Sequence, residues 1–146
     1  MKAALLVIFI AMTVPCHAQG VTHMPAPIVF FDIAGADGKA LRDFYAGIFG
    51  WDIKENNNFS VPVNSQMLMG AIRQDPPETL FYIGVSDITK TLGEIAGKGG
   101  SIEVPRLEVP GVVIVGIFRD PAGNRVGLVE MENGKAKIPQ ARDSKD

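Results

Sequence analysis

The sequence has few of the side chains that bind transition metals or act as catalytic nucleophiles. Its 146 residues include one cysteine, Cys16, and two histidines, His17 and His23. All three precede the first segment with a strand pattern. A folded region without histidine or cysteine can form neither a Cys–His nor a Ser–His–Asp nucleophile system. It also cannot form a histidine-based zinc or iron site, so we expect no metal and no cofactor.

Clusters of positive charge are missing as well. The sequence has fourteen lysine and arginine residues and sixteen aspartate and glutamate residues, and the basic residues do not cluster in any one segment. This pattern lacks the basic patch that binds nucleic acid, so we expect no nucleic-acid partner. The single cysteine also excludes an intramolecular disulfide, which means that apolar burial must stabilise the fold.

The long apolar run is confined to the start of the chain, MKAALLVIFIAMTVPCHAQG. Lys2 precedes an uncharged run at 3–14, and the small residues Cys16 and Ala18 stand three and one positions before a cleavage point at Gln19. This order is typical of a secretory signal peptide over residues 1–18. A permanent anchor is an alternative, although the run is shorter than the roughly 20 residues that span a bilayer. Lipid attachment at Cys16 is a further alternative, which the preceding Pro15 disfavours. We predict an exported protein, periplasmic or secreted, that leaves the membrane after cleavage.

Strand and helix patterns then occur twice in the same order. After a flexible lead-in at 19–27, the first half reads as a strand at 28–33, a helix at 38–49 and strands at 51–55, 59–63 and 66–72. The second half reads as a strand at 80–85, a helix that Ser86 or Asp87 caps, and strands at 102–104, 112–118 and 125–131. The sequence therefore predicts an α+β domain at 28–132, built of two βαβββ modules (28–74 and 79–132), followed by a polar tail at 133–146.

Three motifs occur in this framework: FYAGIFGW in the first helix, YIGVSDI at the start of the second module, and FRDPAGNRVGLVE at the end. With the repeated modules, they resemble the vicinal oxygen chelate superfamily, which includes glyoxalase I, bleomycin-resistance proteins and extradiol dioxygenases. The resemblance covers residues 28–131. It implies an eight-stranded, curled mixed sheet shaped like a cup, with a ligand or metal on the concave face. It also implies a homodimer, which the apolar segment around Met67 and Met69 supports.

The resemblance further implies where metal ligands would lie: on the first and last strands of each module. These positions fall on Phe30, Met69, Leu80 and Gly127, and none of the four side chains is expected to coordinate a metal. Gly127 stands where metal-binding members have a carboxylate. We therefore expect a member that lacks the metal ligands, with neither lactoylglutathione lyase nor ring-cleaving dioxygenase activity.

Strand alternation adds two polar residues to the expected cup. Asp32 shares a face with Phe30, and Tyr82 shares a face with Leu80. A few polar groups in an apolar cavity are typical of small-molecule sites. The alternative is that Asp32 is solvated at the end of its strand and that the Tyr82 hydroxyl points away from the cup. We expect Gly127 and Gly84 to leave open space, and Arg125, on the face of Gly127, could reach an anionic ligand.

These features leave three functions open. The first is binding of a small organic ligand in a metal-free cup by the candidate residues Phe30, Asp32, Met69, Leu80, Tyr82, Arg125 and Gly127. The second is a metal-independent lyase or isomerase in which Asp32 is the base and Tyr82 the acid. The third is a non-catalytic interaction module whose own side chains fill the cup. The fold by itself does not choose among them.

Overall fold

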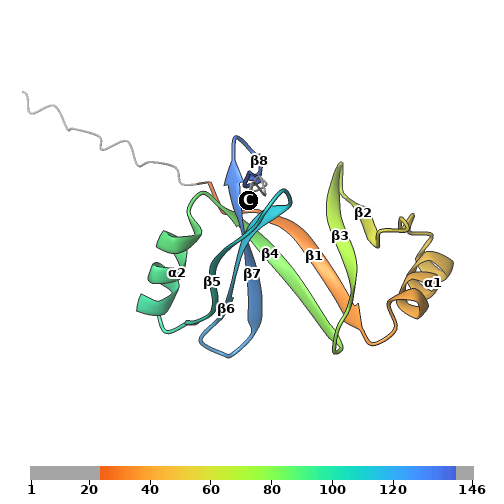
Figure 1. The fold of residues 1–146 in the computed structure, drawn as a ribbon, viewed down its shortest axis with the longest axis horizontal. Coiled ribbons are helices and arrows are strands. Elements are labelled where there is room, and N and C mark those ends of the chain that lie inside the picture. The colour runs from red at the N-terminus through yellow and green to blue at the C-terminus, as the bar shows by residue number, and fades with distance from the viewer. Residues whose placement is uncertain (1–23, 141–146) are drawn as a thin grey trace, which may run out of the picture.

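Eight strands form a curled, open sheet, and both helices lie on its outer side (Figure 1). The structure is a computed structural model that describes residues 24–140. The predicted signal peptide and most of the lead-in therefore lie outside the described residues, as does the end of the tail. No helix in the described part of the chain is long and apolar enough to cross a membrane.

The elements follow the predicted order, except that the first half lacks one predicted strand. The first half contains β1 (Ile28–Gly35), α1 (Gly38–Phe49), β2 (Asn58–Val63) and β3 (Gln66–Gln74). The second contains β4 (Glu78–Val85), α2 (Ile88–Gly97), β5 (Ser101–Val109), β6 (Val113–Arg119), β7 (Arg125–Glu132) and β8 (Lys135–Ala136). The α+β fold class with an eight-stranded, curled mixed sheet is confirmed.

The strand order brings the first strands of both halves to the centre of the sheet. The order is β2-β3-β1-β4-β7-β6-β5, and β8 pairs with β7. In each half the first strand runs parallel to a later one, β1 to β3 and β4 to β7. The halves join where β1 and β4 run antiparallel, with Phe30 opposite Tyr82 and Asp32 opposite Leu80. Residues from both halves therefore meet on one face at this seam.

Both helices begin at an aspartate cap. The Asp37 carboxylate accepts a hydrogen bond of 2.9 Å from the Ala40 amide, and the Asp87 carboxylate accepts one of 2.9 Å from the Lys90 amide. Such caps satisfy amides that have no partner within the helix. The cap of α2 is therefore Asp87 and not Ser86. Helix α1 ends at Gly50, whose φ of 68° is the left-handed conformation that glycine adopts easily.

One predicted strand does not form. Residues 51–54 have no regular structure and lead into a turn at 55–56. The Asn57 amide donates to the Lys54 carbonyl across this turn, the Lys54 amide donates to the Asn58 carbonyl, and Asn57 has a φ of 64°. Trp51 instead stacks between Tyr45 and Phe59, at centroid distances of 5.2 and 5.1 Å. The first half is therefore βαββ. The eighth strand is the short β8, which lies in the predicted polar tail at 133–146.

The main core lies between the sheet and α2. It consists of buried side chains from α2, β6 and β7, namely Ile88, Leu92, Ile114, Phe118, Val126 and Leu128. The apolar residues of α1 recur at helical spacing (Leu41, Phe44, Tyr45, Ile48 and Phe49), which predicts one buried stripe. That prediction is wrong in part, because Phe44, Ile48 and Phe49 are 55%, 66% and 57% exposed. Aromatic contacts with Tyr45 hold Phe44 and Phe49 against the helix, but no strand at 51–55 covers them.

Candidate functional site

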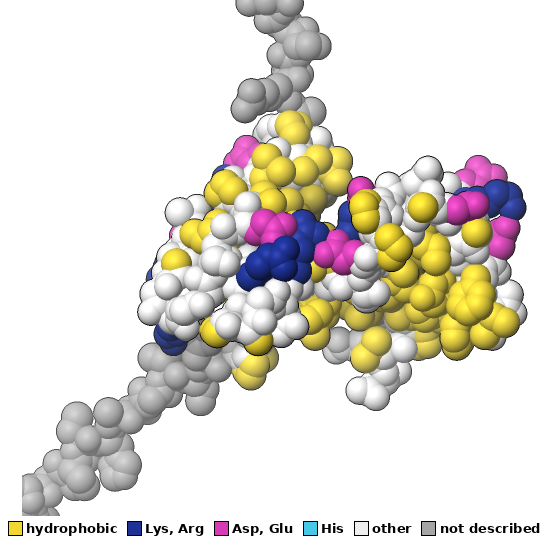
Figure 2. All heavy atoms as spheres, turned by 90° about the horizontal axis from the view of Figure 1, so that it is seen from below, with side chains coloured by type: hydrophobic (Ala, Val, Ile, Leu, Met, Phe, Trp, Pro, Cys, Tyr) yellow, Lys and Arg dark blue, Asp and Glu magenta, His cyan; other side chains and the backbone are white. Residues whose placement is uncertain are grey.

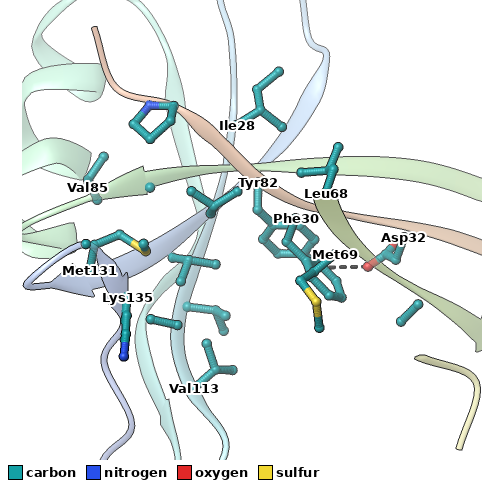
Figure 3. Close-up of a pocket in the computed structure, with 18 of the residues that line it drawn as sticks. Ile28, Phe30, Asp32, Leu68, Met69, Tyr82, Val85, Val113, Met131 and Lys135 are labelled. Atoms are coloured by element: carbon teal, nitrogen blue, oxygen red, sulfur yellow. Dashed lines mark hydrogen bonds between the residues drawn. The ribbon is translucent and has the colours of Figure 1, made fainter. Parts of the chain in front are cut away.

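The concave face of the sheet, opposite both helices, encloses a hollow of about 1080 Å³. Its wall combines side chains from both halves of the chain, and Figure 3 shows how they lie. Phe30, Met69 and Tyr82 are grouped beside Asp32, and Met131 and Lys135 lie toward the other end. The wall is mostly apolar with few polar groups, which is the usual composition of a small-molecule site.

Strand alternation explains which side chains face the hollow. On β1, Phe30 and Asp32 point inward, while Phe31 contacts Trp51 and Phe59 on the side of the helices. This is the period of two that a strand imposes. The prediction that Asp32 shares a face with Phe30 is therefore correct, and Tyr82, predicted to share a face with Leu80, also lines the hollow. The alternative of a solvated Asp32 is wrong, because the residue is buried.

Asp32 is the centre of a buried polar unit. The residue is 1% exposed, and its carboxylate oxygen Oδ2 accepts a hydrogen bond of 2.9 Å from the Tyr82 hydroxyl. The Arg73 Nε atom lies 3.0 Å from the same oxygen. Burial, together with the Asp32 charge, raises the pKa of Tyr82 well above its ordinary value. Tyr82 therefore keeps its proton at neutral pH, and this proton is directed at Asp32.

The polar unit continues into a chain of ion pairs across one end of the sheet. Arg73 also pairs with Asp75 and Glu78, Arg125 joins Glu78 to Glu103, and Arg119 pairs with Glu103. The hydrogen bond from Arg125 is the main reason that the pKa of Glu78 is lowered. Figure 2 shows acidic and basic side chains gathered near the middle of the molecule, beside a broad apolar surface on the first half. The chain of ion pairs joins the two halves.

Gly127 lies beneath the Tyr82 ring. The two residues are neighbours in the parallel pairing of β4 and β7, and a Cβ atom at Gly127 would collide with the ring atoms of Tyr82. At Gly84, a Cβ atom would lie 2.8 Å from Val29 Cγ1 and 2.9 Å from Met131 Cγ. The expectation that these glycines leave open space is therefore wrong. Tyr82 takes the space at Gly127, and Val29 and Met131 take it at Gly84.

Four of the seven predicted site residues meet at the hollow: Phe30, Asp32, Met69 and Tyr82. The other three do not line it. Leu80 is opposite Asp32 in the sheet but is not part of the wall of the hollow. Gly127 is covered by the Tyr82 ring, and Arg125 is held by Glu78 and Glu103 instead of reaching a ligand. A ligand-binding role for each of the seven stays a prediction.

Sequence reasoning missed Arg73. The predicted strand ended at residue 72, whereas β3 continues to Gln74. Arg73 is two residues beyond Ala71 and four beyond Met69, so alternation would have placed it on the inner face if the strand had been extended. Its pairing with Asp32 follows from the parallel register of β1 and β3, which no local pattern shows.

The residues at the expected metal positions do not fit a metal ion. Phe30, Met69, Leu80 and Gly127 supply no carboxylate, imidazole or thiolate, and the Tyr82 ring covers Gly127. Within residues 24–140, no three histidine, cysteine, aspartate or glutamate residues are placed to hold a metal ion together.

Several solved structures share the fold at low identity. A methylmalonyl-CoA epimerase in complex with methylmalonyl-CoA and NH4+ has a TM-score of 0.55 and 15% identity, covering 77% of this chain and 99% of its own. A single-residue variant of the Streptomyces coelicolor epimerase, in complex with 2-nitronate-propionyl-CoA, has a TM-score of 0.53, 15% identity and the same coverage. The hypothetical protein BH1468 from Bacillus halodurans C-125 has a TM-score of 0.52 and 14% identity, covering 76% and 98%. These likenesses show the fold alone.

No curated protein matches the sequence. A family model does, and it spans residues 27–128, from the residue before β1 into β7. This range includes Phe30, Asp32, Arg73, Tyr82 and Gly127, and with them both halves of the sheet. The chain belongs to the Glyoxalase/Bleomycin resistance protein/Dioxygenase superfamily.

Proposed function

We propose that the protein binds a small organic ligand on the concave face of its sheet, without a metal. The observation that carries this proposal is the hollow itself, whose apolar wall surrounds one buried polar unit made of Asp32, Tyr82 and Arg73. An apolar wall provides affinity through burial, and a few fixed polar groups orient the ligand. The volume of about 1080 Å³ also argues against an interaction module whose own side chains fill the cup.

Binding is favoured over catalysis by the way the two candidate catalytic groups are arranged. An acid and a base that act on one substrate each need to reach it. Here the Tyr82 hydroxyl donates to the Asp32 carboxylate, so the two groups form one unit on one wall. The raised pKa of Tyr82 also makes it a weaker acid. A metal-independent lyase or isomerase with Asp32 as its base is the alternative function. The fold that the chain shares with methylmalonyl-CoA epimerases is compatible with it.

Native mass spectrometry of protein purified from its own host tests the proposal. We expect a co-purified small molecule, and we expect Ala71→Phe to remove it because Ala71 lines the hollow and a phenyl ring would occupy it. Ala96→Phe, at an exposed position on α2, is the matched control and should retain the molecule. Retention of the molecule by Ala71→Phe at full occupancy would contradict a site in this hollow.

We also propose that the protein is exported. The support is the order of charge, apolar run and small residues in the first 18 residues of the sequence. N-terminal sequencing of protein from the native host should find Gln19 first. A soluble cytoplasmic species that still carries Met1 would contradict export.

A homodimer is the third part of the proposal. The expectation of a dimer rested in part on Met67 and Met69, and both line the hollow. The site therefore explains these two methionines at least as well as a dimer interface does. The exposed Phe44, Ile48 and Phe49 of α1 supply a separate apolar surface. Light scattering after gel filtration should give the mass of two chains, and Ile48→Glu should reduce it more than Met67→Glu does. The mass of one chain at every concentration would exclude the dimer.

A further inference from the structure

The buried polar unit has two atoms without a hydrogen-bond partner among the described residues. They are the second carboxylate oxygen of Asp32, Oδ1, and the Nε atom of Arg73. Nε lies 3.0 Å from Oδ2, but its N–H is not directed at that oxygen as a hydrogen bond requires. One buried acceptor and one buried donor are therefore both unsatisfied.

The polar groups around these two atoms already have other partners. The Tyr82 hydroxyl already donates to Oδ2, and the Nη1 and Nη2 atoms of Arg73 pair with Asp75 and Glu78. A buried polar atom without a partner destabilises the folded state, so native proteins rarely keep one without a reason. Two such atoms side by side, on residues that both line the hollow, indicate a place for a ligand group.

The two atoms have opposite hydrogen-bonding character. Oδ1 accepts, and Nε–H donates. A hydroxyl or carboxamide group can satisfy both, because each donates and accepts. An ammonium group only donates, and a carboxylate only accepts and would face the Asp32 charge. The ion-paired group as a whole has four carboxylates (Asp32, Asp75, Glu78 and Glu103) and three guanidinium groups (Arg73, Arg119 and Arg125). The excess negative charge further disfavours a carboxylate.

We propose that the ligand is an apolar molecule bearing a neutral hydroxyl or carboxamide, which donates to Asp32 Oδ1 and accepts from Arg73 Nε. This inference rests on the proposed function and names the ligand class. The apolar body lies against Phe30, Val115 and Val129, which line the hollow. Met69, 53% exposed and unbranched, lies beside Asp32 and moves to admit the polar group (Figure 3).

A matched series of naphthalene probes tests this class, because the apolar body stays constant while the head group changes. The probes are 2-naphthamide, which donates and accepts, methyl 2-naphthoate and 2-naphthoate, which only accept, and 2-naphthylmethylammonium, which only donates. Isothermal titration with the full-length mature protein should show 2-naphthamide binding at least about tenfold more tightly than the other three, a factor worth about 1.4 kcal/mol.

An Asp32→Asn variant should remove the preference for 2-naphthamide, because the new amide exchanges an acceptor for a donor at nearly constant shape. Asp52→Asn, the same change at an exposed position, should leave the preference intact. The wild-type series decides the question by itself if Asp32→Asn does not fold. Equal binding of all four probes, as expected if trapped water satisfies both atoms, would overturn the inference and leave the proposed function standing. Failure of all four to bind would count against both.

Discussion

Gly127 and Tyr82 depend on each other at the level of single atoms. The aromatic ring lies where any side chain at 127 would be, and its hydroxyl reaches Asp32 from that position. Gly127 is not among the described glycines with positive φ, so the requirement comes from the neighbour and not from the backbone. The glycine, at the position where the resemblance implies a metal-binding carboxylate, thus permits the ring that lines the hollow.

Replacing Gly127 with alanine should therefore displace the ring. We expect Gly127→Ala to lower the free energy of unfolding by about 1–3 kcal/mol, the usual cost of overpacking. In a Tyr82→Ala background the same change should cost much less, since the clash is gone. Urea unfolding of the four proteins in this cycle measures the coupling. An equal cost in both backgrounds would show that the ring is not the cause.

Single residues also show the limits of sequence reasoning. Alternation along β1 and β4 correctly placed Asp32 and Tyr82 on the inner face, because side-chain direction in a strand is a local property. Their hydrogen bond, and the contact with Arg73, depend on which strands are neighbours and in which register. β1 pairs with β3 and β4, segments that are distant in the sequence, and the local pattern of one strand does not show which distant strand it pairs with.

The helices were the elements that the sequence predicted best. Apolar periodicity, aspartate caps and the terminal Gly50 are all local signals, and the structure contains each of them. The prediction of a strand at 51–55 was wrong, because alternation of apolar and polar residues is not unique to strands. In the structure this segment places Trp51 in an aromatic stack. The two residues of β8 offer too short a pattern to distinguish a strand from a tail.

Two glycines at the end of α1 should respond in opposite ways to alanine. Gly47 lies inside the helix, and a Cβ atom there would meet nothing within 4 Å. Gly47→Ala should stabilise the protein by about 0.5–1 kcal/mol, because glycine has poor helix propensity. Gly50→Ala should lower the free energy of unfolding by about 1 kcal/mol, because Gly50 has a left-handed φ of 68°. Thermal unfolding measures both, and a change of the same sign at the two positions would contradict this account of the helix end.

Across the whole molecule, buried or paired carboxylates link stability to pH. Hydrogen bonds from Arg125 and from Arg106 are the main causes that hold the pKa values of Glu78 and Glu130 below their ordinary value of 4.5. A lowered pKa in the folded state means that the ionised form stabilises the fold. This contribution is present above the unfolded-state pKa and is lost as the pH falls through the lower, folded-state value.

We therefore expect the free energy of unfolding to change little from about pH 7 to about pH 5 and to fall steadily below that. Urea unfolding at a series of pH values measures the curve. Glu130→Gln should lower stability at neutral pH and flatten the acid decline, since Glu130 is 5% exposed and paired with Arg106. Stability that rises on acidification would contradict the role of these ion pairs.

The overall architecture was predictable because it is repeated. Two segments with the same order of patterns support each other, so an error in one, such as 51–55, does not change the fold class. The filling of the cup was not predictable in the same way. Whether Gly127 and Gly84 border open space depends on the conformations of neighbouring side chains. The Tyr82 ring occupies the space beside Gly127, and Met131 occupies the space beside Gly84.

Trp51 is the only tryptophan of the chain, and it is packed between Tyr45 and Phe59 on the helix side of the sheet. The hollow opens on the opposite side. Intrinsic tryptophan fluorescence should therefore report the melting of the first half and stay constant when a ligand enters the hollow. An optical assay of binding will need a reporter on the other surface of the sheet, and the exposed Met67 at the rim is a suitable place to introduce one.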